Sequence, residues 1–224
     1  MSTKLLQFPI LQIALNTVHD KLVSIRRLNR LTQHLVHHIP SNAQILDVGS
    51  GNGELAAMLM QLRPDITIKG MDVLVRPDTA IPIMPFDGHY IPFPKKSFDV
   101  VMLIDVLHHT MEPLILLQEA RRVARSHVLV KDHLCEGVLA NRTLRFMDWV
   151  GNRGHGVALP YNYLSKAEWM SLLNTAGLKI MAWNQNLRLY PWLFSALFDR
   201  QLHVIMDLRP SAIASSSIDS VVRS

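Results

Sequence analysis

A glycine-rich loop beside an acidic residue is the stretch of this sequence whose spacing most directly indicates chemistry. Residues 49–53 read Gly-Ser-Gly-Asn-Gly and follow the apolar run 45–48, which contains Asp47. Glycines let a ligand lie against bare main chain, and the helix expected next would point free N–H groups at it. The loop lacks both the lysine of phosphate loops and the spacing of dinucleotide folds. We therefore predict a site for a positively charged cofactor without a pyrophosphate, formed by Asp47, Gly49, Ser50, Gly51 and Gly53.

A second acid stands at the end of the next predicted strand. Residues 66–72 read Ile-Thr-Ile-Lys-Gly-Met-Asp, which we interpret as a strand that ends in Asp72. A carboxylate at a strand tip can accept hydrogen bonds from both hydroxyls of a ribose that lies across the sheet edge. We expect Asp72 to bind a ribose; the alternative is an aspartate that only caps a turn.

The residues Leu46-Asp47-Val48-Gly49-Ser50-Gly51-Asn52-Gly53 resemble the first motif of the class I S-adenosylmethionine-dependent methyltransferases. The resemblance covers roughly residues 30 to 130. Within the family, this stretch is similar to the branch of enzymes that modify small molecules. It implies S-adenosylmethionine as the cofactor. Two features depart from the family pattern: residues 124–126 read Ala-Arg-Ser where Pro-Gly-Gly is usual, and no Asn-Pro-Pro-Tyr type sequence follows the fourth strand. The second departure argues against amino groups of nucleic acids as substrates.

The resemblance also implies roles for residues to which spacing alone assigns none. Asp87 with Gly88 beside it, followed by Ile-Pro-Phe at 91–93, is similar to the family aspartate that binds the adenine amine. The segment from Asp105 to His108 is similar to the one whose backbone passes the methionine half of the cofactor. We therefore add Asp87, Gly88, Asp105 and His108 to the expected cofactor site.

Candidate residues for binding and activating an acceptor cluster after the fifth predicted strand. We expect residues 134–163 to form a lid, because this insertion is rich in polar and aromatic side chains at a strand tip, where specificity usually resides. The first choice for a general base is His133, whose ordinary pKa lies near neutrality and which Asp132 or Asp148 could orient. Base or clamp roles are also open to further lid residues, which are His155, Tyr161 and Tyr163.

The elements that must position these residues alternate along the chain as in a doubly wound α/β sheet. Strands are expected to begin near residues 45, 66, 84, 100, 127, 178 and 201, and helices are expected over 55–62, 112–125, 134–150 and 165–176. The result is a Rossmann-like sheet of seven strands with helices on both faces and a helical lid after strand 5. The resemblance implies that the seventh strand runs antiparallel.

Three segments make up the expected domain organisation. Residues 1–40 carry apolar positions at helical spacing and form an N-terminal helical cap, residues 41–209 form the methyltransferase domain with its lid at 134–163, and residues 210–224 form a flexible tail. The cap also carries His34, His37 and His38. We interpret them as surface histidines, because no third ligand for a metal lies nearby.

Composition narrows the possible classes of protein. With 224 residues, 49% hydrophobic and 18% charged, the chain is expected to fold as one domain with a substantial core. A single cysteine removes disulfides and thiolate zinc clusters, so we expect no metal and a reducing, cytoplasmic environment. The net charge of +5 is scattered, and no apolar run is long enough to cross a membrane. We expect a small-molecule acceptor, no nucleic acid, no integral membrane segment, and a possible oligomer through the N-terminal helix.

The predicted function is transfer of a methyl group from S-adenosylmethionine to an oxygen, nitrogen or carbon nucleophile of a small molecule. Two alternatives remain, because a fold that binds a cofactor does not determine the reaction. The first is an enzyme that cyclises or cleaves the same cofactor. The second is a binding protein without catalytic activity on the same fold.

Overall fold

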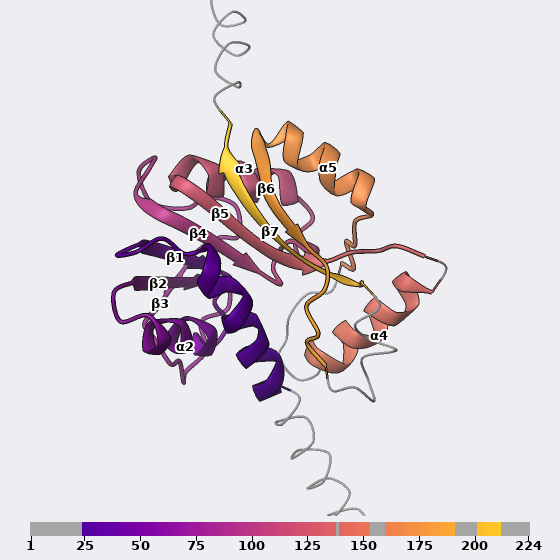
Figure 1. Cartoon of the computed structure of the whole chain (residues 1–224), viewed down its shortest axis with the longest axis horizontal. Helices are drawn as coiled ribbons and strands as arrows, with labels where there is room; N and C mark the ends of the chain where they lie inside the picture. Colours follow the sequence, from indigo (N-terminus) through magenta and orange to yellow (C-terminus); the bar gives the residue numbers. More distant parts are fainter. Residues whose placement is uncertain (1–23, 138, 153–159, 191–200, 212–224) are drawn as a thin grey trace, which may run out of the picture.

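A mixed seven-stranded sheet forms the centre of the computed structural model, which describes residues 24–137, 139–152, 160–190 and 201–211 (Figure 1). The strand order is β3-β2-β1-β4-β5-β7-β6. The strands are β1 Gln44–Val48, β2 Thr67–Asp72, β3 Ile83–Pro85, β4 Phe98–Ile104, β5 Ala124–His133, β6 Leu178–Asn184 and β7 His203–Pro210. The predicted seven-stranded, Rossmann-like sheet is therefore confirmed.

Because β1 to β5 run in the same direction, their carboxyl ends, which the predicted site residues follow, lie at one edge of the sheet. Strands β1 to β5 run parallel, and β1 lies between β2 and β4, with Val48 paired to Met71 on one side and to Leu103 on the other. Strand β7 runs antiparallel between β5 and β6, as the family resemblance implies. Because of this direction the first residue of β7, His203, pairs with the last residue of β5, His133.

Helices cover both faces of the sheet, as expected for a doubly wound fold. The helices are residues 24–35, α2 Glu54–Leu62, α3 Pro113–Val123, α4 Ala140–Asn152 and α5 Lys166–Thr175, with short 3-10 turns η1 Val36–His38 and η2 Leu107–His109. Helix 24–35 and α2 bury Leu35 and Leu59 in one core, whereas α3 and α5 bury Leu117 and Trp169 in the other. Figure 1 shows α4 beyond the ends of the strands, apart from the helices that cover the sheet.

Local sequence explains why the elements begin where they do. The apolar run of β4 is fully buried from Val100 to Leu103, as expected for a strand covered on both faces. At the start of α5, the Ser165 side chain accepts from the Glu168 N–H, and the Glu168 side chain accepts from the Ser165 N–H. This capping box confirms the predicted helix start.

Two predicted boundaries were wrong, and both differ because of long-range pairing. Strand β5 begins at Ala124, which pairs with Phe98, so the Ala-Arg-Ser segment is strand and not a turn. The helix predicted over 134–150 begins at Ala140 instead of residue 134. The Leu134 N–H donates to the Leu202 carbonyl at 2.9 Å and the Cys135 N–H donates to the Leu164 carbonyl at 2.9 Å, which keeps this stretch extended.

The described part of the N-terminal cap packs on the chain's own sheet. His34 Nε2 lies 2.9 Å from the Leu187 carbonyl oxygen, and His38 Nδ1 lies 3.4 Å from Asp207. These two histidines are partly exposed and also contact other segments of the chain, and His37 is exposed. Residues 1–23 of the cap, residues 153–159 of the lid and residues 212–224 of the tail lie outside the described residues. Among the described helices, none combines the length and the apolar character that crossing a membrane requires.

Candidate cofactor and acceptor site

The glycine loop is fastened to β2 and leaves one glycine facing open space. Gly49, Gly51 and Gly53 all have positive φ, at 76°, 61° and 76°. A Cβ atom on Gly49 would lie 2.4 Å from Val106, and one on Gly53 would lie 2.7 Å from Ile81, so these two glycines are required by packing. A Cβ atom on Gly51 would meet nothing within 4 Å. The main chain at Gly51 is therefore the part of the loop against which a ligand could lie.

Ser50 and Asp47 hold the loop in this shape. The Ser50 hydroxyl donates to the Asp47 carbonyl at 2.6 Å and accepts from the Met71 N–H at 3.1 Å, while the Gly49 N–H donates to the Met71 carbonyl at 2.8 Å. The Asp47 carboxyl group is buried. Burial raises its pKa to about 7, and the nearby charge of Asp72 acts in the same direction. A nearby cation would lower this pKa, so Asp47 could lose its proton near neutral pH when a positively charged ligand binds.

Asp72 and Asp87 follow neighbouring strands at the same edge. One oxygen of Asp72 accepts from the Gly51 N–H at 2.8 Å and the other accepts from the Leu74 N–H at 2.9 Å. A carboxylate has about four lone-pair positions, so Asp72 can still accept from a ligand. The exposed Asp87 accepts from the His89 and Tyr90 N–H groups, both at 2.8 Å, and these bonds lower its pKa. Because β2 pairs with β1 and with β3, these two acids lie beside the glycine loop.

Asp105, at the end of β4, is engaged by two cations of the chain itself. Its carboxylate accepts hydrogen bonds from Arg27 of helix 24–35 and from Lys131 of β5. Burial opposes ionisation of Asp105, but the charges of Lys131 and Arg27 outweigh burial and hold its pKa below the usual range. Lys131 is fully buried, and burial lowers its pKa. Asp105 would therefore contact a cofactor through its backbone and not through its carboxylate.

His108 stands between two carboxylates rather than facing the cofactor loop. Its Nδ1 lies 2.7 Å from Asp132, and its Nε2 lies 3.5 Å from Asp148 of α4. Burial lowers the pKa of His108, but the charge and hydrogen bond of Asp132 more than offset this, so the pKa is raised. The Tyr163 hydroxyl donates to Asp148 at 2.5 Å, and burial followed by this bond raises the pKa of Tyr163. Tyr163 thus keeps its proton and does not suit the role of base.

His133 and His203 form a neutral pair beside this network. His133 is 5% exposed, and burial, followed by the charge of His108, lowers its pKa well below the ordinary value. Within the described residues its Nδ1 has no hydrogen-bond partner. Of the two residues predicted to orient it, Asp132 lies 3.7 Å away and is instead hydrogen-bonded to His108 at 2.7 Å, and Asp148 lies 3.8 Å from its Nε2. Lys131 Nζ lies 3.4 Å from His203 Nδ1, and the ring centres of the two histidines are 5.1 Å apart.

A metal is not required by this arrangement. Among the described residues, Asp105, His108 and His133 offer ligand atoms that lie within 4.8 Å of one another. However, the carboxylate of Asp105 already accepts from Arg27 and Lys131, and two adjacent cations disfavour a third. We therefore assign no metal to these residues.

The structure brings most of the predicted site residues to one edge of the sheet. Tyr161 packs under Arg145, whose guanidinium carbon lies 4.4 Å from the ring centre, and Tyr163 lies beside His133 with ring centres 5.5 Å apart. His155 lies outside the described residues. Sequence reasoning missed Arg27, Lys131 and His203. Of these three, only Lys131 could have been noticed in the sequence, because it is a lysine that follows apolar residues within a predicted strand.

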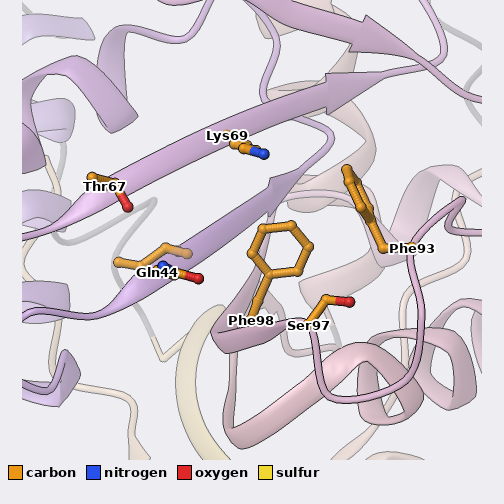
Figure 2. Close-up of a pocket in the computed structure, with 7 residues that line it drawn as sticks. Gln44, Thr67, Lys69, Phe93, Ser97 and Phe98 are labelled. Carbon is orange, nitrogen blue, oxygen red and sulfur yellow. The ribbon is translucent and has the colours of Figure 1, made fainter.

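A concave region lies at the opposite ends of the same strands, away from the candidate site. Figure 2 shows it between the first residues of β1, β2 and β4, and its lining includes Gln44, Lys69, Phe93 and Phe98. Lys69 Nζ lies 5.9 Å from the centre of the Phe93 ring. Because the glycine loop follows the carboxyl end of β1, this pocket is separate from the candidate site.

Comparisons with known proteins indicate the family to which the chain belongs. A family model described as a methyltransferase domain matches residues 20–182. The 27-O-demethylrifamycin SV methyltransferase of Amycolatopsis mediterranei is 30% identical over 111 residues, which cover 43% of this chain and 40% of that protein. The ubiquinone/menaquinone biosynthesis C-methyltransferase UbiE of Cupriavidus pinatubonensis is 24% identical over 157 residues, which cover 62% of this chain and 65% of that protein. The chain thus spans less than two thirds of the length of either relative.

The fold is shared with solved methyltransferase structures. The methyltransferase in a complex with the Haloferax volcanii Trm112 methyltransferase activator superposes with a TM-score of 0.63 at 14% identity, over 86% of this chain and 93% of that one. This likeness concerns the fold alone, whereas the family model covers most of the sequence, including the glycine loop and the acids that follow it. The chain belongs to the class I S-adenosylmethionine-dependent methyltransferases.

Proposed function

We propose that this protein binds S-adenosylmethionine at the glycine loop and transfers its methyl group to a nucleophile of a small molecule. The observation that carries the proposal is the open main chain at Gly51, whose N–H is bonded to Asp72. A ligand that lies on Gly51 would meet the carboxylate of Asp72 at the same place. This combination fits an adenosyl group whose ribose hydroxyls donate to Asp72.

The residues around the loop suit the chemistry of this cofactor. When bound, S-adenosylmethionine supplies a methyl group on a positively charged sulfur atom. Asp47 lies behind the loop and gains a favourable interaction with positive charge once it ionises. Asp87 would accept from the adenine amine, and the backbone at Asp105 and His108 would pass the methionine half.

His133 is our candidate for removing the proton of the acceptor. Its lowered pKa keeps the ring neutral at pH 7, and its Nδ1, which has no hydrogen-bond partner in the described part of the chain, can accept a proton. The imidazolium that results would lie 3.7 Å from Asp132 and 3.8 Å from Asp148. Two carboxylates would thus stabilise the charge that forms during the reaction.

We infer that α4 moves when an acceptor reaches His133. The side chain of His133 is 5% exposed, and Asp148 of α4 lies against it. An α4 that moves away and returns would act as the predicted lid and would exclude water during the transfer. The printed names of the relatives, which act on a rifamycin and in ubiquinone or menaquinone biosynthesis, support a small-molecule acceptor.

Substitution of Gly51 tests cofactor binding with a matched control. Gly51→Ala adds a methyl group on the open face of the loop and strains a left-handed backbone, so we expect cofactor affinity to fall about tenfold or more. Gly137 also has a positive φ and open space at its Cβ position, but it lies outside the loop. Calorimetry should show that Gly137→Ala binds S-adenosylmethionine like the parent protein. Equal affinity for all three proteins would contradict the proposal.

Methyl transfer itself is tested with a cofactor labelled in its methyl group. Incubation with a small-molecule extract should move the label into an extractable product and release S-adenosylhomocysteine only when extract is present. Formation of methylthioadenosine from the cofactor alone would favour the rival that cleaves or cyclises the cofactor. Binding with no turnover against any extract would favour a protein without catalytic activity.

A further inference from the structure

The outer face of α4 carries side chains that are unusual for a helix facing solvent. Leu139, just before the helix, is 50% exposed, Phe146 is 53% exposed and Trp149 is 50% exposed. Arg142 and Arg145 are exposed between them. Positions three and four apart lie on one side of a helix, so these five residues form a single band, which we call the α4 outer stripe.

The opposite face of α4 attaches the helix to the protein. Ala140 and Leu144 are buried in a small core with Tyr163 and Leu202, and Asp148 is buried against the histidines of the candidate site. The burial of this inner face accounts for the position of α4. Of the α4 outer stripe, Arg145 also contacts the protein, since its guanidinium carbon lies 4.4 Å from the ring centre of Tyr161.

The exposed charge of α4 has one sign. Asp148 is the only acidic residue of the helix, and it is buried. The exposed charged groups of the helix are those of Arg142 and Arg145, and the whole chain carries a net charge of +5. Exposed aromatic side chains can insert at the interface of a membrane, and exposed arginines near that interface are attracted by anionic headgroups.

We propose that the α4 outer stripe docks on an anionic lipid surface. The arginines would be attracted by the negative headgroups, and Phe146, Trp149 and Leu139 would insert between headgroup and acyl chain. A face of a helix of this length offers on the order of 200 Å². A stable protein partner needs about 800 Å² on each side, which the stripe does not supply. A bilayer has no such requirement.

Docking would bring the candidate site close to the bilayer. The same helix carries the α4 outer stripe on one face and Asp148 of the acceptor site on the other. An apolar acceptor dissolved in the bilayer would then reach the site without crossing water. This last step rests on the proposed function, whereas docking on lipid does not.

Vesicle sedimentation with the full chain tests the docking. We expect the protein to sediment with vesicles of mixed phosphatidylcholine and phosphatidylglycerol, not with phosphatidylcholine alone, and to be released as salt is raised. Arg142→Gln should lower the partition coefficient about fivefold. Phe146→Ser should lower it on the order of fivefold as well. Cofactor affinity should be unchanged in both variants, because neither residue belongs to the proposed site.

Met170 provides a matched control on another helix. It lies on α5 and is 49% exposed, so Met170→Ser removes a similar apolar side chain from a surface outside the stripe. We expect this variant to bind vesicles like the parent protein. Absence of binding to anionic vesicles, or equal losses for Phe146→Ser and Met170→Ser, would overturn the proposal. So would a dimer in light scattering that Phe146→Ser dissociates, because the stripe would then face a second copy.

Discussion

The carboxyl group of Asp47 is buried at the end of β1, and burial raises its pKa to about 7. An aspartate of an unfolded chain has a pKa near 3.8, so the folded protein holds one more proton between these two values. This stabilising effect is complete below about pH 4 and is lost as pH rises through 7, a change of about 4 kcal/mol. Asp47→Asn should remove this fall in stability between pH 5 and pH 8 in urea unfolding.

Asp65, whose pKa is lowered where that of Asp47 is raised, supplies a control. Its hydrogen bond with Arg63 lowers its pKa far below the range tested, so it stays ionised throughout. Asp65→Asn should leave the slope of stability against pH unchanged. A slope in Asp47→Asn as steep as in the parent protein would show that Asp47 titrates normally.

Cofactor binding should depend on the same carboxyl group. A cation bound near Asp47 lowers its pKa, so binding near neutral pH releases a proton and affinity rises with pH through about 7. Calorimetry in buffers of different ionisation enthalpy measures this release. Proton release that persists in Asp47→Asn would assign it to another group.

Another histidine on β5 provides a matched control for the proposed base. His133→Gln should lower the turnover rate about a hundredfold or more and leave cofactor affinity unchanged. His127, at the other end of β5, lies 2.8 Å from Asp207 and far from the site, so His127→Gln should keep its turnover. Transfer of labelled methyl groups measures both. Similar rates for the two variants would exclude His133 as the base.

At the scale of elements, a buried charge network joins helix 24–35, β4 and β5. Lys131 is fully buried and bonded to Asp105, which also bonds Arg27. Lys131→Met leaves a buried carboxylate short of one partner, and we expect a loss of about 3 kcal/mol or more in the free energy of unfolding. The exposed Lys179 of β6 is the control, since Lys179→Met should change stability by less than about 0.5 kcal/mol.

Removing both charges should recover part of that loss. Asp105→Asn combined with Lys131→Met takes away the carboxylate that lacks one partner. It leaves Arg27 without its carboxylate partner, but the Arg27 side chain is 36% exposed and can be solvated. Asparagine tolerates the positive φ of 58° at this position. Urea unfolding of the double variant therefore distinguishes a charge effect from a packing effect. A double variant that is less stable than Lys131→Met would assign the loss to packing.

Elements with a strong local pattern could be predicted from the sequence, and contacts between distant segments could not. The loop at Gly51 and the cap at Ser165 depend on neighbouring residues, so their patterns were sufficient. The start of α4 depends instead on hydrogen bonds to Leu164 and Leu202, which no window around residue 134 contains. In the site, the pairing of His133 with His203 arises from the register of β5 and β7, and spacing along the chain carries no trace of it.

The whole molecule should respond to the cofactor as a unit, because the loop, β2 and β4 belong to one sheet. At a cofactor concentration about a hundred times its dissociation constant, the folded state gains about 2.7 kcal/mol. For a chain of this size each kcal/mol raises the melting temperature by roughly 2–4 °C. Thermal unfolding should show this rise for the parent protein and a smaller one for Gly51→Ala. An equal rise in both would place the ligand elsewhere.

The most direct test of the account is a crystal structure of the protein grown with S-adenosylhomocysteine. We predict that the adenosyl group lies on the main chain at Gly51, with the ribose hydroxyls bonded to Asp72 and the adenine amine near Asp87. A structure in which the ligand is bound away from this loop, or in which the loop closes on itself and the ligand is absent at saturating concentration, would contradict the account.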